Sequence, residues 1–215
     1  MPAIDPAQLS PRDRYRLGIG AVVPRPIAWI TTIDAAGTVN LAPFSYFNGV
    51  CTSPLILSVS IAHRDPIKDT LGNLRAGGEA VVHLVPPAQL AAMHASGGEY
   101  RHEIGEAALL GLELTPSERV RPPRLSCAEV AFECRLHREI AVGEPAVALC
   151  LLEAVLVHLA DDVTGADGLP DPQRVRAVAR LGGDAYLRGE HWDVTELPRT
   201  PLPPELAVRR PPRGG

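Results

Sequence analysis

The chain has 215 residues, of which 46% are hydrophobic and 21% are charged. This composition is typical of a folded globular protein, and the length suggests one large domain. The formal net charge of −4 argues against a nucleic-acid partner, because domains that bind nucleic acids are usually basic. The N-terminus lacks the apolar stretch of a signal peptide, and the longest apolar run, Ala146 to Leu152, is too short for a membrane helix. We therefore expect a soluble, cytoplasmic protein without membrane contact.

The cysteines and the cations also limit the functional classes. The four cysteines show no C-x-x-C pair and no zinc-site spacing, so no metal site is predicted. All of them except Cys51 lie in apolar or alternating stretches, which favours buried structural thiols. Of the 21 lysines and arginines, only Lys68 is a lysine. Because arginine is so common in this chain, an arginine is weak evidence of a binding site. The single lysine is somewhat stronger evidence.

The first part of the chain is predicted to form strands joined by short turns. Residues 1–24 form an irregular lead-in with one short helix around Arg12 to Leu17. The predicted strands cover Ile27 to Ile33, Val39 to Phe47 and the LILSVSI string after Pro54, and Asp34 to Gly37 form a turn. Pro43 lacks a backbone donor, so the second strand lies at a sheet edge or bulges there.

Helices are predicted in the middle of the chain. They cover Asp65 to Arg75, Pro87 to Ala95 and Ile104 to Leu110, with a strand at Glu79 to Val85 after the first. Asp65 is a good N-cap and Pro66 suits the first helical position, so we expect the first helix to begin there. Glycines follow each helix, as is typical of helix ends.

The second part of the chain is again predicted to be extended. Residues 128–142 alternate between apolar and polar, and Ala146 to His158 is apolar on both faces apart from Glu153. The second stretch therefore lies in a barrel interior or at a subunit contact. A turn at Asp161 to Gly168 and a last short strand at His191 to Glu196 follow. The order of elements predicts a mainly β fold, a small antiparallel β-barrel with a few helices, over 1–197, with a Pro/Arg-rich tail over 198–215.

Several enzyme motifs are missing from the sequence. It has no G-x-G-x-x-G after a strand, no P-loop, no G-x-S-x-G and no H-E-x-x-H, which argues against Rossmann dehydrogenases, P-loop enzymes, α/β hydrolases and zincins. The densest group of ligand-type side chains has no metal-site spacing and is interpreted as a solvated loop. It comprises His94, Glu99, His102, Glu103 and Glu106.

Two polar strings of residues indicate a ligand-binding site. Asn40 to Ser45 ends a strand at a proline, which leaves backbone groups available to a planar heteroaromatic ligand. Lys68-Asp69-Thr70 lies on the first turn of a predicted helix, where backbone N–H groups, a lysine and a hydroxyl suit a phosphate. The carboxylates of Asp65 and Asp69 oppose such a ligand and must be turned away. A capped surface helix without a ligand remains the alternative.

The same residues resemble a known family. The strings PRPIAWITTIDAAGTVNLAPFSYFNGVCTSPLILSVSI, KDTLGNL, EAVVHLV, PPRL and RLGGDAY follow one another as in the flavin reductase-like proteins of the FMN-binding split-barrel superfamily. The resemblance covers about residues 15 to 190. It implies a homodimer of split barrels that holds FMN near the subunit interface. The chain departs from the family at His83 and His94, where family members often carry Asn, and this affects substrate or nicotinamide contacts more than FMN binding.

The resemblance also implies a set of site residues and an activity. The implied cofactor-binding residues are Asn40, Ala42, Pro43, Phe44, Ser45, Ser60, Lys68, Asp69, Thr70, Asn73, Arg180, Gly183 and Tyr186. The implied enzyme is an NAD(P)H:flavin oxidoreductase that passes electrons to an acceptor such as a partner oxygenase, and no side-chain acid or base is required. The alternative is a flavoredoxin-like electron carrier that binds FMN without efficient NAD(P)H turnover. A third alternative is a dimeric barrel that serves as a binding module without flavin.

Overall fold

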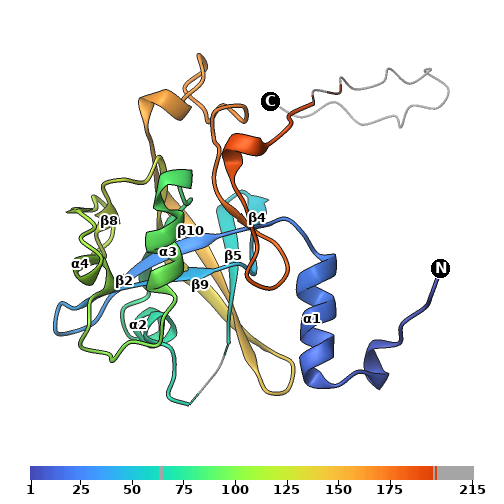
Figure 1. Ribbon diagram of the computed structural model, residues 1–215. Coiled ribbons are helices and arrows are strands. Elements are labelled where there is room, and N and C mark those ends of the chain that lie inside the picture. Colours follow the sequence, from blue (N-terminus) through green and yellow to red (C-terminus); the bar gives the residue numbers. More distant parts are fainter. Residues whose placement is uncertain (63–64, 196, 198–215) are drawn as a thin grey trace, which may run out of the picture.

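The computed structural model describes residues 1–62, 65–195 and 197. A seven-stranded antiparallel sheet dominates the molecule, as predicted, and the helices pack around it (Figure 1). In sheet order the strands are β3 (Val39–Phe44), β2 (Ala28–Ile33), β6 (Glu79–His83), β9 (Val130–Val142), β10 (Val147–Leu159), β5 (Leu55–Ala62) and β4 (Phe47–Thr52).

The sheet curls back on itself at one corner. β3 and β4 lie at opposite ends of the sheet order, although only Ser45 and Tyr46 separate them in the sequence. The extended stretch predicted over Val39 to Phe47, with its interruption at Pro43, is therefore wrong in its last part, because the chain bends at Ser45 and Tyr46 instead. The Ser60 N–H donates to the Tyr46 carbonyl over 2.9 Å and closes the corner. The two edges must meet near this bend, which makes the sheet a split barrel. The edge position of the Pro43 strand is confirmed.

In the described part of the chain, four α-helices accompany the sheet. They are α1 (Pro11–Ala21), α2 (Asp69–Gly77), α3 (Leu90–Ser96) and α4 (Glu106–Leu109), together with the 3-10 turns Pro6–Gln8, Pro87–Gln89, Asp161–Val163 and Gly189–His191. α2, α3 and α4 lie on one side of the molecule, and α1 lies apart from them (Figure 1).

α1 is longer than the sequence predicts. The Ser10 hydroxyl accepts from the Asp13 N–H and caps the helix, and Pro11 occupies its first turn. The guanidinium of Arg25 donates to the carbonyls of Ile19 and Val22, each over 2.7 Å. A buried arginine thus satisfies the C-terminal carbonyls of a helix that contains two glycines.

α2 begins three residues later than predicted, with Lys68 rather than Asp65 at the N-cap. Lys68 stands at the N-cap with extended backbone angles, and Asp69 and Thr70 are the first helical residues. The carbonyl of Lys68 accepts from the N–H groups of Leu71 and Gly72, so the first turn is built on Lys68 rather than on Asp65. The helix therefore places the Lys-Asp-Thr string at its N-terminus, although the predicted start is wrong.

Two apolar clusters hold the barrel and its helices together. The first lies inside the barrel and includes Ile30, Val59 and Val82, and the second lies under α3 and includes Trp29 and Met93. The prediction of structural thiols is confirmed for Cys134 and Cys150, because both are buried in the first cluster. Burial raises the pKa of Cys134 to about 12 and that of Cys150 to about 11.

Short ladders complete the fold beyond the main sheet. β1 (Arg25–Pro26), β11 (Ala179–Arg180) and β12 (Tyr186–Leu187) form a three-stranded sheet, and β7 (Leu114–Thr115) pairs with β8 (Arg124–Leu125). The strand predicted at His191 to Glu196 is wrong, since the chain makes a 3-10 turn over Gly189–His191 and is not in a strand over 192–195. Gly189 lies directly against the backbone of Arg176, so that a β-carbon at this position of the turn would not fit. The predicted tail, 198–215, is outside the described residues.

No helix in the described part of the chain is long and apolar enough to cross a membrane.

Candidate functional site

A cleft of about 590 Å³ lies between β3, the N-terminal end of α2 and the loop that follows α3. We call it the β3–α2 cleft. Its lining residues are Asn40, Ala42, Pro43, 65–70, 96–103 and Glu106. The cleft brings together the two polar strings that the sequence singled out, from positions about 25 residues apart.

Six of the predicted site residues line this cleft. Asn40, Ala42 and Pro43 come from the edge strand β3, and Lys68, Asp69 and Thr70 come from the start of α2. Ala42 and Pro43 present an apolar wall, whereas α2 presents a cation and the N–H groups of its first turn. The cleft thus has an apolar end and a polar end, as a planar ring with an anionic side chain would require.

Buried hydrogen bonds fasten the floor of the cleft. The side-chain amide of Asn40 donates to the Thr70 hydroxyl over 2.9 Å and to the Thr32 hydroxyl over 3.2 Å. Asn73 donates to the same Thr32 hydroxyl over 3.0 Å. Thr70 is 1% exposed, so its side chain supports the cleft from within the protein and is hardly accessible from the cleft opening. Asn73 lies behind the cleft lining and belongs to this supporting network.

The other predicted site residues lie elsewhere. Phe44 is buried in the barrel core, and Ser45 stands at the bend between β3 and β4. Ser60 pairs with Leu149 in the register of β5 and β10, on the sheet face opposite the core residues Val59 and Ile61. These residues do not line the β3–α2 cleft of a single chain, and their contact with a flavin stays a prediction.

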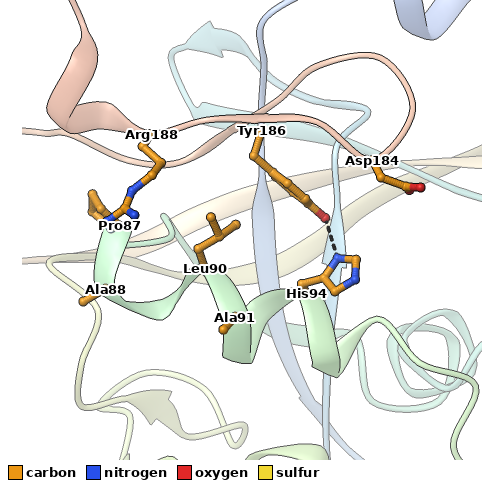
Figure 2. Close-up of a pocket in the computed structure, with 8 residues that line it drawn as sticks. All are labelled: Pro87, Ala88, Leu90, Ala91, His94, Asp184, Tyr186 and Arg188. Atoms are coloured by element: carbon orange, nitrogen blue, oxygen red, sulfur yellow. Dashed lines mark hydrogen bonds between the residues drawn. The ribbon is translucent and has the colours of Figure 1, made fainter.

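Arg180, Gly183 and Tyr186 belong to the β11–β12 hairpin, which borders a second hollow of about 710 Å³ (Figure 2). The hollow is lined by Pro87, Ala88, Leu90, Ala91, His94, Asp184, Tyr186 and Arg188. His94 and the Tyr186 hydroxyl share a hydrogen bond of 2.9 Å across it, and Arg180 both donates to that hydroxyl and stacks on the Tyr186 ring. α3 therefore separates the two hollows, because His94 faces one while Ser96, at its end, lines the other.

The loop after α3 is a cleft wall that the sequence analysis missed. Gly97 approaches Pro43 so closely that a β-carbon there would lie 3.2 Å from the proline ring. The glycine pair Gly97-Gly98 is the sequence signal for this close approach, although such a pair is equally typical of a helix end. The interpretation of this segment as a solvated loop is wrong for Glu106, which is 6% exposed and accepts from the Leu41 N–H over 2.7 Å. Burial raises the pKa of Glu106.

His102 of this loop contacts two carboxylates. Its Nδ1 lies 2.7 Å from Asp69 Oδ1, and its Nε2 lies 3.4 Å from Asp34 Oδ2. The hydrogen bond to Asp69 and the charge of that carboxylate raise the pKa of His102. Asp69 is thus directed toward His102, which is the orientation that an anionic ligand beside Lys68 would need. Among the described residues no group of three or more metal-type side chains is placed to hold an ion.

His83, one of the two departures from the family pattern, is part of the core. Its side chain is fully buried, accepts from the Leu125 N–H through Nε2 and contacts the Trp29 carbonyl through Nδ1. It cannot contact a substrate from this position. His94, the other departure, lies at the second hollow.

Comparisons with known proteins agree with this geometry. A family model described as a flavin reductase like domain matches residues 20–178. An uncharacterized protein of Halalkalibacterium halodurans is 36% identical over 202 residues, covering 91% of this chain and 95% of that protein. The chain therefore belongs to the flavin reductase-like family, and its fold is that family's split barrel.

Two solved structures are also similar along nearly the whole chain. Nitrilotriacetate monooxygenase component B from Bacillus cereus matches with a TM-score of 0.86 and 31% identity, covering 92% of this chain and 98% of that one. The 2-nitrobenzoate 2-nitroreductase of Pseudomonas fluorescens matches with a TM-score of 0.82 and 28% identity, covering 97% and 100%. Both are named for oxidoreductase systems.

Proposed function

We propose that this protein binds FMN in the β3–α2 cleft and acts as an NAD(P)H:flavin oxidoreductase that passes electrons to an acceptor. The observation that carries the proposal is the meeting of the Asn40–Pro43 wall with the Lys68–Thr70 string in one cleft of a flavin reductase-like chain. When bound, the flavin supplies the hydride and electron-transfer chemistry.

The residues of the cleft fit such a cofactor. Its volume lies within the range of about 300–1,000 Å³ that is typical of small-molecule sites. Ala42 and Pro43 suit the face of a planar ring, and the close approach of Gly97 to Pro43 narrows the cleft at that end. Lys68 and the N–H groups that begin α2 suit a phosphate at the other end. In this arrangement the protein binds and orients the cofactor, and no side chain must move a proton.

The acceptor in this proposal is a partner oxygenase. Support comes from the similarity to a chain that is named as component B of a monooxygenase. We further propose that the protein is a homodimer. In β10, Ala148, Cys150 and Leu152 face the core, so Val147, Leu149 and Leu151 lie on the opposite, outer face of the sheet. An apolar outer face of this kind suits a second copy of the chain.

Absorbance spectroscopy of the purified protein tests the proposed function. We expect flavin absorbance bands, which disappear under anaerobic conditions when NADH or NADPH is added. Bands that dithionite bleaches and neither nucleotide bleaches would favour an electron carrier. A colourless protein that does not bind added FMN would contradict the flavin proposal.

Substitution of Lys68 tests the position of the phosphate. Because a hydrogen bond to a charged group contributes about 1.5–3 kcal/mol, Lys68→Gln should weaken FMN binding by that amount and leave riboflavin binding nearly unchanged. Lys68→Arg retains the charge and is the matched control. Flavin fluorescence titrations measure both affinities, and an equal FMN affinity in Lys68→Gln and wild type would remove Lys68 from the site.

A further inference from the structure

His102 connects two walls of the β3–α2 cleft. It comes from the loop after α3, whereas Asp34 belongs to the turn between β2 and β3 and Asp69 to the first turn of α2. The imidazole lies 2.7 Å from Asp69 and 3.4 Å from Asp34, one carboxylate on each ring nitrogen. The ring is hydrogen-bonded to Asp69 and lies within ion-pair distance of Asp34, and two neighbouring negative charges favour the protonated imidazolium.

The charges around the cleft are predominantly negative. Five carboxylates line it, whereas Lys68 and Arg101 are the lining residues with a permanent positive charge. The charged and titratable groups at the cleft and around His102 are Asp34, Asp65, Lys68, Asp69, Glu99, Tyr100, Arg101, Glu103 and Glu106. A cleft with this balance repels an anion unless some of the carboxylates are neutralised. His102 contacts one lining carboxylate, Asp69, and also Asp34, which is not among the lining residues.

We propose that the imidazolium of His102 neutralises Asp34 and Asp69 and thereby makes the cleft select a phosphorylated flavin over an uncharged one. This proposal rests on the proposed function, since it names the ligand of the same cleft. In it His102 is a specificity-determining residue that acts on the ligand through the two carboxylates. The preference for FMN over riboflavin should then depend on pH.

The direction of this dependence follows from the surroundings of His102. The hydrogen bond to Asp69 raises the pKa of His102 above its usual value, so the cation persists to a higher pH than in an isolated histidine. Above that pKa the ring is neutral, and it no longer compensates the charge of Asp69 in the cleft lining or of Asp34 next to it. The affinity for FMN should fall as the pH rises through this range, while riboflavin, which has no phosphate, is little affected.

Titration of the FMN phosphate itself would change the affinity for FMN in the opposite direction. Its second pKa is about 6, so it gains negative charge with rising pH, and a site with permanent cations would then bind it more tightly. A decrease of FMN affinity with rising pH is therefore not explained by the ligand alone.

The test measures the dissociation constants of FMN and riboflavin by fluorescence between pH 6 and 9 for wild type and His102→Gln. We expect the variant to bind FMN about tenfold more weakly than wild type at low pH, a difference of about 1.4 kcal/mol. At high pH the two proteins should converge. His102→Lys carries a permanent cation and should keep tight FMN binding over the whole range.

Two further measurements complete the design. His137→Gln removes a histidine that pairs with Glu153 on β9 and β10 and does not line the cleft, so it should behave as wild type. An NMR titration of the unliganded protein should show a raised pKa for His102, which Asp69→Asn should lower.

The outcomes separate this proposal from the proposed function. A wild-type protein that binds neither flavin overturns both. Flavin binding with the same FMN pH profile in wild type and His102→Gln overturns only the role of His102. Equal losses of FMN and riboflavin affinity in His102→Gln also overturn it, because they would show that His102 shapes the wall rather than compensates charge.

Discussion

His83 shows how one side chain can be mistaken for a functional residue. It stands at a position where the family resemblance suggested a contact to substrate, yet it is fully buried between β2 and β8. Its Nε2 accepts from the Leu125 N–H, so Nδ1 carries the proton and donates to the Trp29 carbonyl. Only the neutral tautomer satisfies both contacts. Burial accordingly lowers the pKa of His83 to about 4.

This burial predicts acid sensitivity. The unfolded chain binds a proton at His83 near pH 6.5, whereas the folded chain resists it down to about pH 4. The neutral ring therefore makes its full contribution to the free energy of unfolding above pH 6.5. This contribution is lost as the pH falls toward 4, at up to about 1.4 kcal/mol per pH unit. Urea unfolding at pH 7 and pH 5 measures this difference.

The control for His83 is a variant that cannot titrate. His83→Phe should be less stable at pH 7 by about 1–3 kcal/mol, since two buried backbone groups lose their partner. It should also lose less additional stability than wild type on acidification. His137→Gln removes an exposed histidine and should retain the wild-type pH dependence. Parallel pH profiles for wild type and His83→Phe would contradict the assignment.

Glu106 is a second residue whose role depends on its neighbours. Leu41 lies on the edge strand β3, and its N–H points away from β2 toward α4, where Glu106 accepts it. The carboxylate thus pairs a backbone donor that an edge strand would otherwise leave open. Glu106→Ala should lower the free energy of unfolding by about 1–3 kcal/mol, and Glu106→Gln, which keeps an acceptor, should lower it less. Thermal and urea unfolding compare the two, and equal losses would argue against the hydrogen bond.

At the scale of elements, α2 depends on its contact with β2 and β3. Thr70, Asn40 and Thr32 form one buried hydrogen-bonded network across these three elements. Leu71 and Leu74 of the same helix pack into the barrel core. The position of the cleft wall is therefore determined by both apolar packing and polar contacts.

Thr70→Val tests the polar part of this contact. Valine has nearly the shape of threonine but cannot accept from Asn40, so we expect a loss of about 0.5–1.5 kcal/mol in the free energy of unfolding. FMN affinity should fall as well, because Asn40 and Thr70 both line the cleft. Thr70→Ser keeps the hydroxyl and is the matched control. A Thr70→Val protein with wild-type stability and affinity would show that the network is dispensable.

At the scale of the whole molecule, the outer face of β10 predicts self-association. We define the outer patch as Val147, Leu149, Leu151 and Ile140, where Ile140 pairs with Leu149 in the register of β9 and β10. Ser60 also pairs with Leu149, so a predicted flavin residue lies on this same face. If two copies meet here, Ser60 lies near the subunit interface, where the family resemblance implies the flavin.

Leu149→Glu should therefore convert a dimer into a monomer, since a carboxylate at an apolar contact is costly to bury. FMN affinity should fall with it. Leu109→Glu is the control, because Leu109 is 57% exposed on α4 and is not part of the outer patch. Size-exclusion chromatography with light scattering measures the mass. A wild-type monomer, or a Leu149→Glu dimer, would contradict this interface.

The fold followed from the sequence where the local pattern is strong. The predicted strands at Ile27 to Ile33 and over 128–142 agree closely with β2 and β9, because alternation and β-branched residues are local properties. The helix α1 is longer than predicted because Arg25, a residue outside the helix, satisfies its C-terminal carbonyls. The predicted start of α2 is wrong because the first helical hydrogen bonds are made to the Lys68 carbonyl rather than to that of Asp65. The last predicted strand is wrong because the chain turns where Gly189 lies against the backbone of Arg176.

The sequence by itself determined the mainly β fold, the family resemblance and the two polar strings that line the cleft. Only the tertiary structure decided that Glu106 covers an edge strand, that His83 is buried, and that His102 meets Asp34 and Asp69. Asp34, Asp69 and His102 come from a turn, a helix and a loop, and no spacing along the chain indicates that they converge. Such contacts arise from how the sheet curls and how the helices pack on it, and local periodicity does not encode either one.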